Sequence, residues 1–143
     1  MSATADDTVA LILAWHDALN AGDVQGVLSR STSDVRIGGP RGTTTGHEAL
    51  AGWIAHAGIE LTPTAIYATD THASATDSAC YVEQDARWPN NPAANPDELL
   101  RACTLFEVRN HLVAATLRYG TLEDALAATG RGWDAVERIW PRA

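Results

Sequence analysis

Ser78-Ala-Cys-Tyr-Val-Glu-Gln-Asp-Ala-Arg-Trp88 decides the fold, because apolar and polar residues alternate along it with the period of a strand. The same alternation marks three further segments, residues 62–71, 100–109 and 112–119. Turn-forming residues stand between them at Ser74–Asp77 and at Asn110-His111, and a loop rich in Pro and Asn follows Trp88. The second half of the chain is therefore predicted to be an antiparallel meander.

The first half has helical periodicity instead. Val9, Ile12, Trp15, His16 and Leu19 recur at steps of three and four residues, which predicts a helix with Thr8 as its N-cap. Further segments are predicted as follows: a helix over 24–30 capped by Asp23, a strand over 34–37 broken by Gly38–Gly42, a helix over 46–58, and helices over 122–129 and 133–140. Helices followed by a meander predict one α+β domain, with helices covering one face of a curved sheet.

Composition excludes several classes of protein. The 143 residues suit about one domain, and a net charge of −8 argues against nucleic acid or an anionic membrane as a partner. The chain has no lysine, which removes Schiff-base mechanisms, and no apolar run long enough to span a membrane. No signal peptide is visible, so we expect a cytoplasmic protein. Cys80 and Cys103 fall on opposite strand faces and are expected to be free thiols, and no metal-binding spacing is present.

One set of short motifs resembles a known superfamily. Ala18-Leu-Asn-Ala-Gly-Asp23, Val27-Leu28, Asp34-Val35, Gly39-Pro40 and Gly46-x-x-Ala-Leu-x-x-Trp53 resemble the opening half of nuclear transport factor 2-like proteins, especially ketosteroid isomerases and SnoaL-like polyketide cyclase-like proteins. The resemblance continues to Tyr119. It implies a cystatin-like α+β barrel, a cone-shaped curved antiparallel sheet around the N-terminal helices, over residues 1–120. Residues 121–143 would form a C-terminal helical extension packed on the same domain.

The catalytic residues of the isomerases are replaced in this chain. The resemblance places their tyrosine donor on Trp15, their general-base aspartate on Gly39 and their protonated aspartate on Thr104. Glycine cannot abstract a proton, and indole is a poorer oxyanion donor than phenol. The resemblance therefore implies a shared cavity without the shared chemistry.

Pleat alternation predicts which side chains face that cavity. On the last two strands of the meander we expect Thr104, Phe106, Leu117 and Tyr119 to point inward, and Thr116 and Arg118 outward. The predicted ligand-binding set is Trp15, Leu19, Ile37, Trp53, Gln84, Trp88, Thr104, Phe106, Leu117 and Tyr119. His16 is the candidate general base, and a structural histidine bonded to a neighbour is the competing interpretation.

Three functions remain open at this point. The first is a protein that binds a small apolar, steroid- or polyketide-like molecule without a cofactor. The second is an isomerase, cyclase or hydrolase that uses His16 with Gln84 in the cavity. The third is a dimerisation scaffold whose own side chains fill the cavity. A homodimer is expected on the outward sheet face, where Tyr81 and Leu105 interrupt a charged row.

Overall fold

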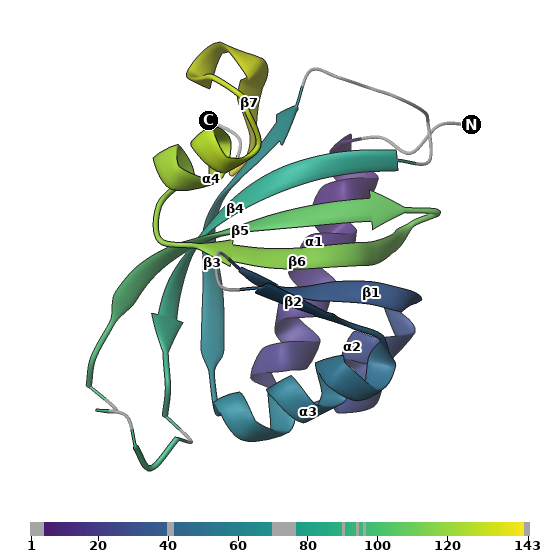
Figure 1. The fold of residues 1–143 in the computed structure, drawn as a ribbon, viewed down its shortest axis with the longest axis vertical. Coiled ribbons are helices and arrows are strands. Elements are labelled where there is room, and N and C mark those ends of the chain that lie inside the picture. Colours follow the sequence, from purple (N-terminus) through teal and green to yellow (C-terminus); the bar gives the residue numbers. More distant parts are fainter. Residues whose placement is uncertain are drawn as a thin grey trace.

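A curved sheet with helices on both faces forms the framework of the protein (Figure 1). The computed structural model describes residues 5–39, 42–69, 77–89, 91–93, 95 and 97–141. The sheet has seven strands in the order β2-β1-β6-β5-β4-β3-β7. Their bounds are β1 Ser31–Gly39, β2 Gly42–Thr45, β3 Glu60–Thr69, β4 Asp77–Arg87, β5 Leu100–Arg109, β6 Leu112–Tyr119 and β7 Val136–Trp140.

The predicted meander is confirmed as β3 to β6. Each of these strands pairs antiparallel with the next. Asn110 and His111 form the tight turn between β5 and β6, with φ of 53° and 65°. The turn expected at Ser74–Asp77 lies outside the described residues, except for Asp77 at the start of β4.

The first strand differs from the prediction in length and partners. β1 runs beyond the predicted 34–37, pairs parallel with β6 and continues through a hairpin into β2, so the sheet is mixed and the break predicted at Gly38 is wrong. Glycine lets the hairpin close here, because a Cβ at Gly38 would lie 2.1 Å from the carbonyl oxygen of Gly42.

Three helices cover one face of the sheet, called the inner face here. They are α1 Ala5–Asn20, α2 Val24–Ser29 and α3 His47–Ala57. Asp23 caps α2 as predicted, since its side chain accepts a hydrogen bond from the Gly26 N–H at 3.0 Å. The prediction for Thr8 is wrong, because α1 already runs from Ala5 and Thr8 is a buried residue within it.

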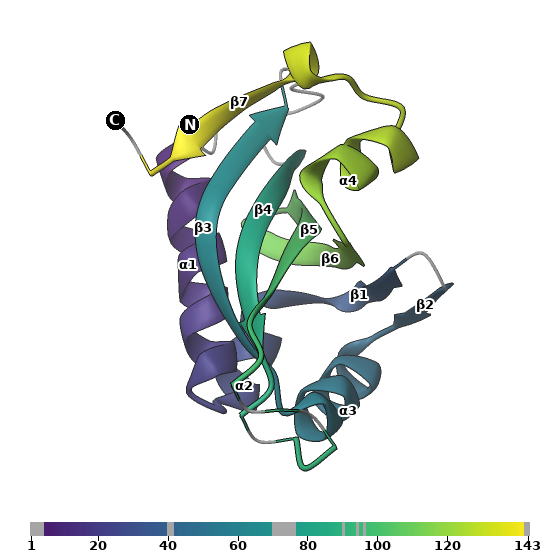
Figure 2. The ribbon, with the colours of Figure 1, turned by 90° about the vertical axis from the view of Figure 1, so that its left-hand side faces the viewer.

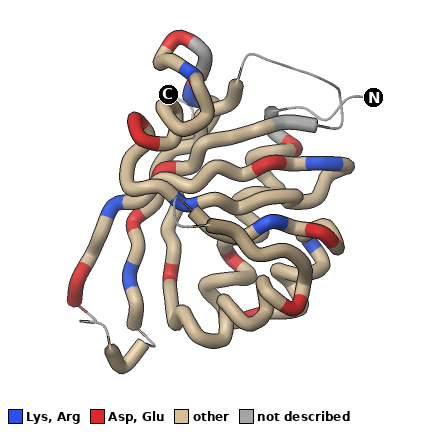
Figure 3. The backbone as a smooth tube through the Cα atoms, viewed as in Figure 1, with Lys and Arg blue, Asp and Glu red and all other residues tan. Residues whose placement is uncertain are grey.

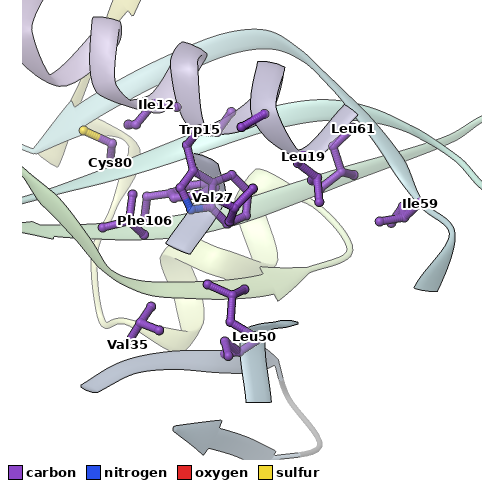
Figure 4. Close-up of a cluster of buried hydrophobic side chains, with 14 of the residues drawn as sticks. Ile12, Trp15, Leu19, Val27, Val35, Leu50, Ile59, Leu61, Cys80 and Phe106 are labelled. Atoms are coloured by element: carbon purple, nitrogen blue, oxygen red, sulfur yellow. The ribbon is translucent and has the colours of Figure 1, made fainter. Parts of the chain in front are cut away.

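The main core lies between these helices and the inner face (Figure 4). Trp15 of α1 packs edge-on against Phe106 of β5, with ring centroids 5.2 Å apart, and neither side chain is exposed. Leu50 of α3 and Val27 of α2 close the cluster from the other helices. The apolar stripe predicted on α1 is thus the part of the main core that this helix contributes.

The outer face of the sheet carries a second, smaller core. Helix α4, Leu122–Ala128, begins at an N-cap Thr121 and packs Leu122 and Leu126 against Tyr81 and Leu105. Figure 2 shows α1 and α4 on opposite sides of the sheet. The apolar residues that suggested a dimer surface are therefore covered by the chain's own helix.

The last element that the structure describes is a strand, and the helix predicted over 133–140 is wrong. A 3₁₀ turn, η1 Trp133–Ala135, leads into β7, which pairs antiparallel with the edge of β3 through Tyr67 and Arg138. The free N–H and C=O groups of an edge strand favour such pairing, and this tertiary preference overrides the local helical pattern.

A β-bulge in β6 reverses the orientation predicted for its second half. Val108 pairs with Val113 but Glu107 pairs with Ala115, so Ala114 is an extra residue. Beyond it Thr116 and Leu117 lie opposite Phe106 and Leu105 respectively. Thr116 and Arg118 consequently face inward. The inward orientation predicted for Leu117 and Tyr119 is wrong, since both pack against the outer core.

Charged residues are interspersed along the strands (Figure 3). Arg36 pairs with Glu107, Arg109 with Asp34, and Arg101 lies 3.7 Å from Asp85. Within the described ranges, no helix is long and apolar enough to cross a membrane.

Candidate functional site

A cavity of about 470 Å³ lies on the inner face, between the β1–β2 hairpin, α3 and the strands β3, β5 and β6. We call it the inner cavity. Its lining residues are Ile37, Gly38, Gly42, Thr43, Thr44, Trp53, Ile59, Leu61, Thr104, Thr116 and Arg118. Apolar side chains and threonines dominate this wall, and Arg118 is its one ionisable side chain among the described residues.

A second cavity of about 470 Å³ adjoins it and is lined by Gly38, Gly39, Arg101, Ala102, Arg118, Tyr119 and Gly120. The two cavities share Gly38 and Arg118. The Arg118 guanidinium carbon lies 5.6 Å from the centre of the Trp88 ring. It has no ion pair among the residues that the structure describes. An unpaired cation thus stands where the two cavities meet.

Behind the wall of the inner cavity runs a buried chain of hydrogen bonds. The Thr104 hydroxyl donates to Gln84 Oε1 at 2.7 Å, and Gln84 Nε2 lies 2.7 Å from His16 Nε2. His16 Nδ1 lies 2.7 Å from the carbonyl oxygen of Ile12. Every side chain in this chain is buried, and a polar group in the core needs such partners.

The electrostatics of His16 follow from this burial. Removal from water lowers the pKa of His16 to about 4, against a smaller raising effect of the hydrogen bond to Ile12. The imidazole is therefore neutral at pH 7, and both ring nitrogens have partners. His16 is not among the residues that line either cavity.

The structure separates the predicted ligand-binding residues into distinct places. Ile37, Trp53 and Thr104 line the inner cavity, and Tyr119 lines the second one. Trp88 is half-buried beneath Arg118, and Gln84 lies one hydrogen bond behind the wall. The remaining residues lie elsewhere in packed cores: Trp15, Leu19 and Phe106 in the inner core, and Leu117 against the outer one.

Several lining residues escaped the sequence analysis. Thr116 and Arg118 were assigned to the wrong face because the bulge at Ala114 has no clear sequence signal. Ile59 directly precedes β3 and Leu61 is its second residue, and both follow Gly58, whose left-handed conformation (φ 58°) ends α3. That glycine is the signal from which this early strand start could have been found.

The two cysteines and possible metal ligands are further candidate catalytic groups among the described residues. Cys80 and Cys103 are free thiols on opposite faces, as predicted, and burial raises the pKa of each to about 12. Neither is a thiolate at neutral pH. Among the described residues, no three His, Cys, Asp or Glu side chains lie close enough together to hold a metal ion.

The structure also shows the surroundings of the three positions that the isomerase resemblance singled out, Trp15, Gly39 and Thr104. The Trp15 indole is buried and donates to the Ser31 hydroxyl at 3.1 Å. A Cβ at Gly39 would lie 2.6 Å from the carbonyl oxygen of Arg118, so the close approach of β1 and β6 leaves no room for an aspartate there. Thr104 already donates its hydroxyl hydrogen to Gln84.

Comparison with solved structures shows the same fold in several bacterial proteins. A proposed polyketide cyclase from a Silicibacter species is 25% identical, with a TM-score of 0.57 over 83% of this chain and 92% of that one. A proposed ketosteroid isomerase from Kribbella flavida is 19% identical, with a TM-score of 0.63 over 81% and 78%. An Anabaena orange carotenoid protein binding canthaxanthin is 12% identical, with a TM-score of 0.65 over 82% of this chain and 38% of that one.

Sequence comparison identifies the family. No curated protein sequence matches the chain. The model of the SnoaL-like domain matches residues 12–116, which run from within α1 to within β6 and include every lining residue of the inner cavity except Arg118. The segment with α4 and β7 lies outside that match. The chain therefore belongs to the SnoaL-like domain family.

Proposed function

We propose that the protein binds a small, largely apolar molecule of steroid- or polyketide-like size in the inner cavity. The observation that best supports this proposal is the chemistry of the cavity wall. Apolar surface comes from Ile37, Trp53, Ile59 and Leu61, and no described lining residue is a carboxylate, histidine or cysteine. A concave, mostly apolar site with few polar groups is the usual form of a small-molecule site.

The size of the cavity supports this proposal. Its volume of about 470 Å³ falls within the range of roughly 300 to 1,000 Å³ that is typical of ligand pockets. Burying about 300 Å² of apolar ligand surface would contribute about 7 kcal/mol before the entropy losses of binding. After those losses, affinity near the millimolar range, about 4 kcal/mol, is within reach of a modest molecule, and a larger apolar surface would bind more tightly.

The names of the structural neighbours are consistent with such a ligand. They include a polyketide cyclase, a ketosteroid isomerase and a carotenoid-binding protein. The alternative, an isomerase, cyclase or hydrolase that uses His16 with Gln84, lacks a comparable observation. His16 lies behind the wall with both nitrogens bonded, so it offers no free lone pair to a substrate proton.

A blocking substitution tests the proposed function. Thr44 is an exposed residue of β2 that lines the inner cavity, so Thr44→Trp should fill the space without disturbing the core. Thr45→Trp is the matched control, since Thr45 is equally exposed on β2 and is not a lining residue. Calorimetric titration with naphthols, steroids and aromatic polyketides should show binding to the wild type and to Thr45→Trp alone.

The thermal midpoint gives a second measurement. A ligand that binds only the folded state should raise it with ligand concentration by mass action. Equal binding by the Thr44→Trp and Thr45→Trp variants, or no binding of any compound to the wild type, would contradict the proposal.

A further inference from the structure

The hydrogen-bond chain behind the inner cavity fixes where its protons lie. The Ile12 carbonyl oxygen can only accept, so the His16 nitrogen that faces it, Nδ1, carries the hydrogen. Because the ring is neutral, the other nitrogen, Nε2, has a lone pair and no hydrogen. The amide NH₂ of Gln84 must then be the group that faces His16, and it donates to that lone pair.

The orientation of Gln84 in turn fixes the orientation of Thr104. With its NH₂ turned to His16, Gln84 presents Oε1 to Thr104, and that oxygen can only accept. Thr104 has a single hydroxyl hydrogen, which it gives to Gln84. Thr104 lines the inner cavity while only 3% exposed, and its hydroxyl hydrogen is committed to Gln84, so any hydrogen bond between Oγ1 and a ligand must be one that Oγ1 accepts.

We propose that the ligand of the inner cavity presents a hydrogen-bond donor, a hydroxyl or an N–H, to Thr104 Oγ1. This inference rests on the proposed function and adds the polarity of the contact. A ligand with a carbonyl or ether oxygen next to Thr104 Oγ1 would bring two hydrogen-bond acceptors together without a hydrogen between them. A buried acceptor without a partner lowers affinity by about tenfold or more. The site thus selects hydroxylated molecules over their oxidised or methylated forms.

Two naphthalene probes separate these cases on the unmodified protein. 2-Naphthol carries a donor, and 2-methoxynaphthalene has the same ring with an acceptor only. The methyl group adds apolar surface, so a cavity without polar preference should bind the ether more tightly. We expect the reverse, with 2-naphthol binding about tenfold more tightly in calorimetric titration.

Substitutions within the chain show whether Thr104 causes the preference. Thr104→Ser keeps the hydroxyl and should keep the ratio of the two affinities. Thr104→Val removes it and should bring the ratio to one or below. Gln84→Met gives the Thr104 hydrogen no internal acceptor, so the hydroxyl can turn to the cavity and the ether should gain affinity. A purely structural role for Gln84 would weaken both probes equally.

The outcomes distinguish this inference from the proposed function on which it rests. Tighter binding of 2-methoxynaphthalene to the wild type, or an unchanged ratio in Thr104→Val, would overturn the donor assignment while small-molecule binding stands. Should Gln84→Met fail to fold, the Thr104→Ser and Thr104→Val pair decides alone. Absence of binding by both probes would overturn this inference, and absence of binding by the steroids and polyketides as well would overturn the proposed function.

Discussion

His16 makes the stability of the protein depend on pH. Its pKa is about 4 in the folded state, against 6.5 for a free imidazole. Between these values the unfolded chain binds a proton that the folded one does not, so the free energy of unfolding rises with pH in this window. The contribution is fully present above pH 6.5 and is lost as the pH falls towards 4. Its size is about 3 kcal/mol.

Urea denaturation at several pH values checks this prediction. His16→Gln keeps hydrogen-bonding groups at the position but removes the titration, so it is the matched control. The wild type should lose more stability than His16→Gln between pH 7 and pH 4.5. The same decrease in both proteins would show that other groups cause the acid sensitivity.

Arg118 should favour ligands that carry an acidic group. It is exposed and has no ion pair among the described residues, so it is free to meet a carboxylate at the shared edge of the two cavities. Arg118→Gln should weaken the binding of 2-naphthoate by about fivefold, the usual scale of an exposed ion pair, and leave 2-naphthol unchanged. Arg101→Gln removes the same charge from the second cavity only. Equal losses in both variants would indicate a general field effect.

Strand β6 illustrates how one extra residue changes an element. Thr116 and Leu117 are neighbours in sequence, yet the former lines the inner cavity and the latter packs against the outer core. Thr116→Phe should therefore lower ligand affinity at least tenfold by filling space. Leu117→Phe should leave affinity unchanged and lower stability by about 1–3 kcal/mol through overpacking. Titration and urea denaturation of the two variants test both statements, and a reversed pattern would contradict the bulge.

The elements that local patterning controls could be predicted from the sequence, and those that depend on distant partners could not. The α1 stripe and β5 were predictable because the period of three to four and the period of two are local signals. β7 forms because β3 has a free edge, which a local window does not contain. β2 depends on the hairpin at Gly38, and the β6 bulge depends on its register with β5.

The same limit applies to the candidate site. Sequence reasoning found Ile37, Trp53 and Thr104 of the wall, and it paired His16 with Gln84 as functional groups. It could not find that these two polar residues bond to each other behind the wall. Whether a buried polar side chain faces a ligand or another side chain depends on three-dimensional packing alone.

The whole molecule protects its outer face with its own C-terminal segment. Leu126 of α4 is 2% exposed and covers Tyr81 and Leu105, the residues that suggested a dimer. These two residues are therefore not accessible to a second copy while α4 is in place. Leu126→Asp should loosen α4 and increase self-association in sedimentation equilibrium, because it exposes the apolar patch beneath. The exposed Leu99→Asp is the control, and equal association of both variants with the wild type would contradict this role of α4.

The strand order also bears on how the chain is completed during synthesis. β1 is made early, but its parallel neighbour β6 leaves the ribosome only after the helix α3 and four more strands, β2 to β5. β3 likewise lacks a partner on one edge until β7, the last strand of the sheet to be made, is synthesised. A nascent chain therefore carries two open strand edges at once, of the kind that attracts foreign strands. Translation speed through residues 112–140 sets how long that exposure lasts.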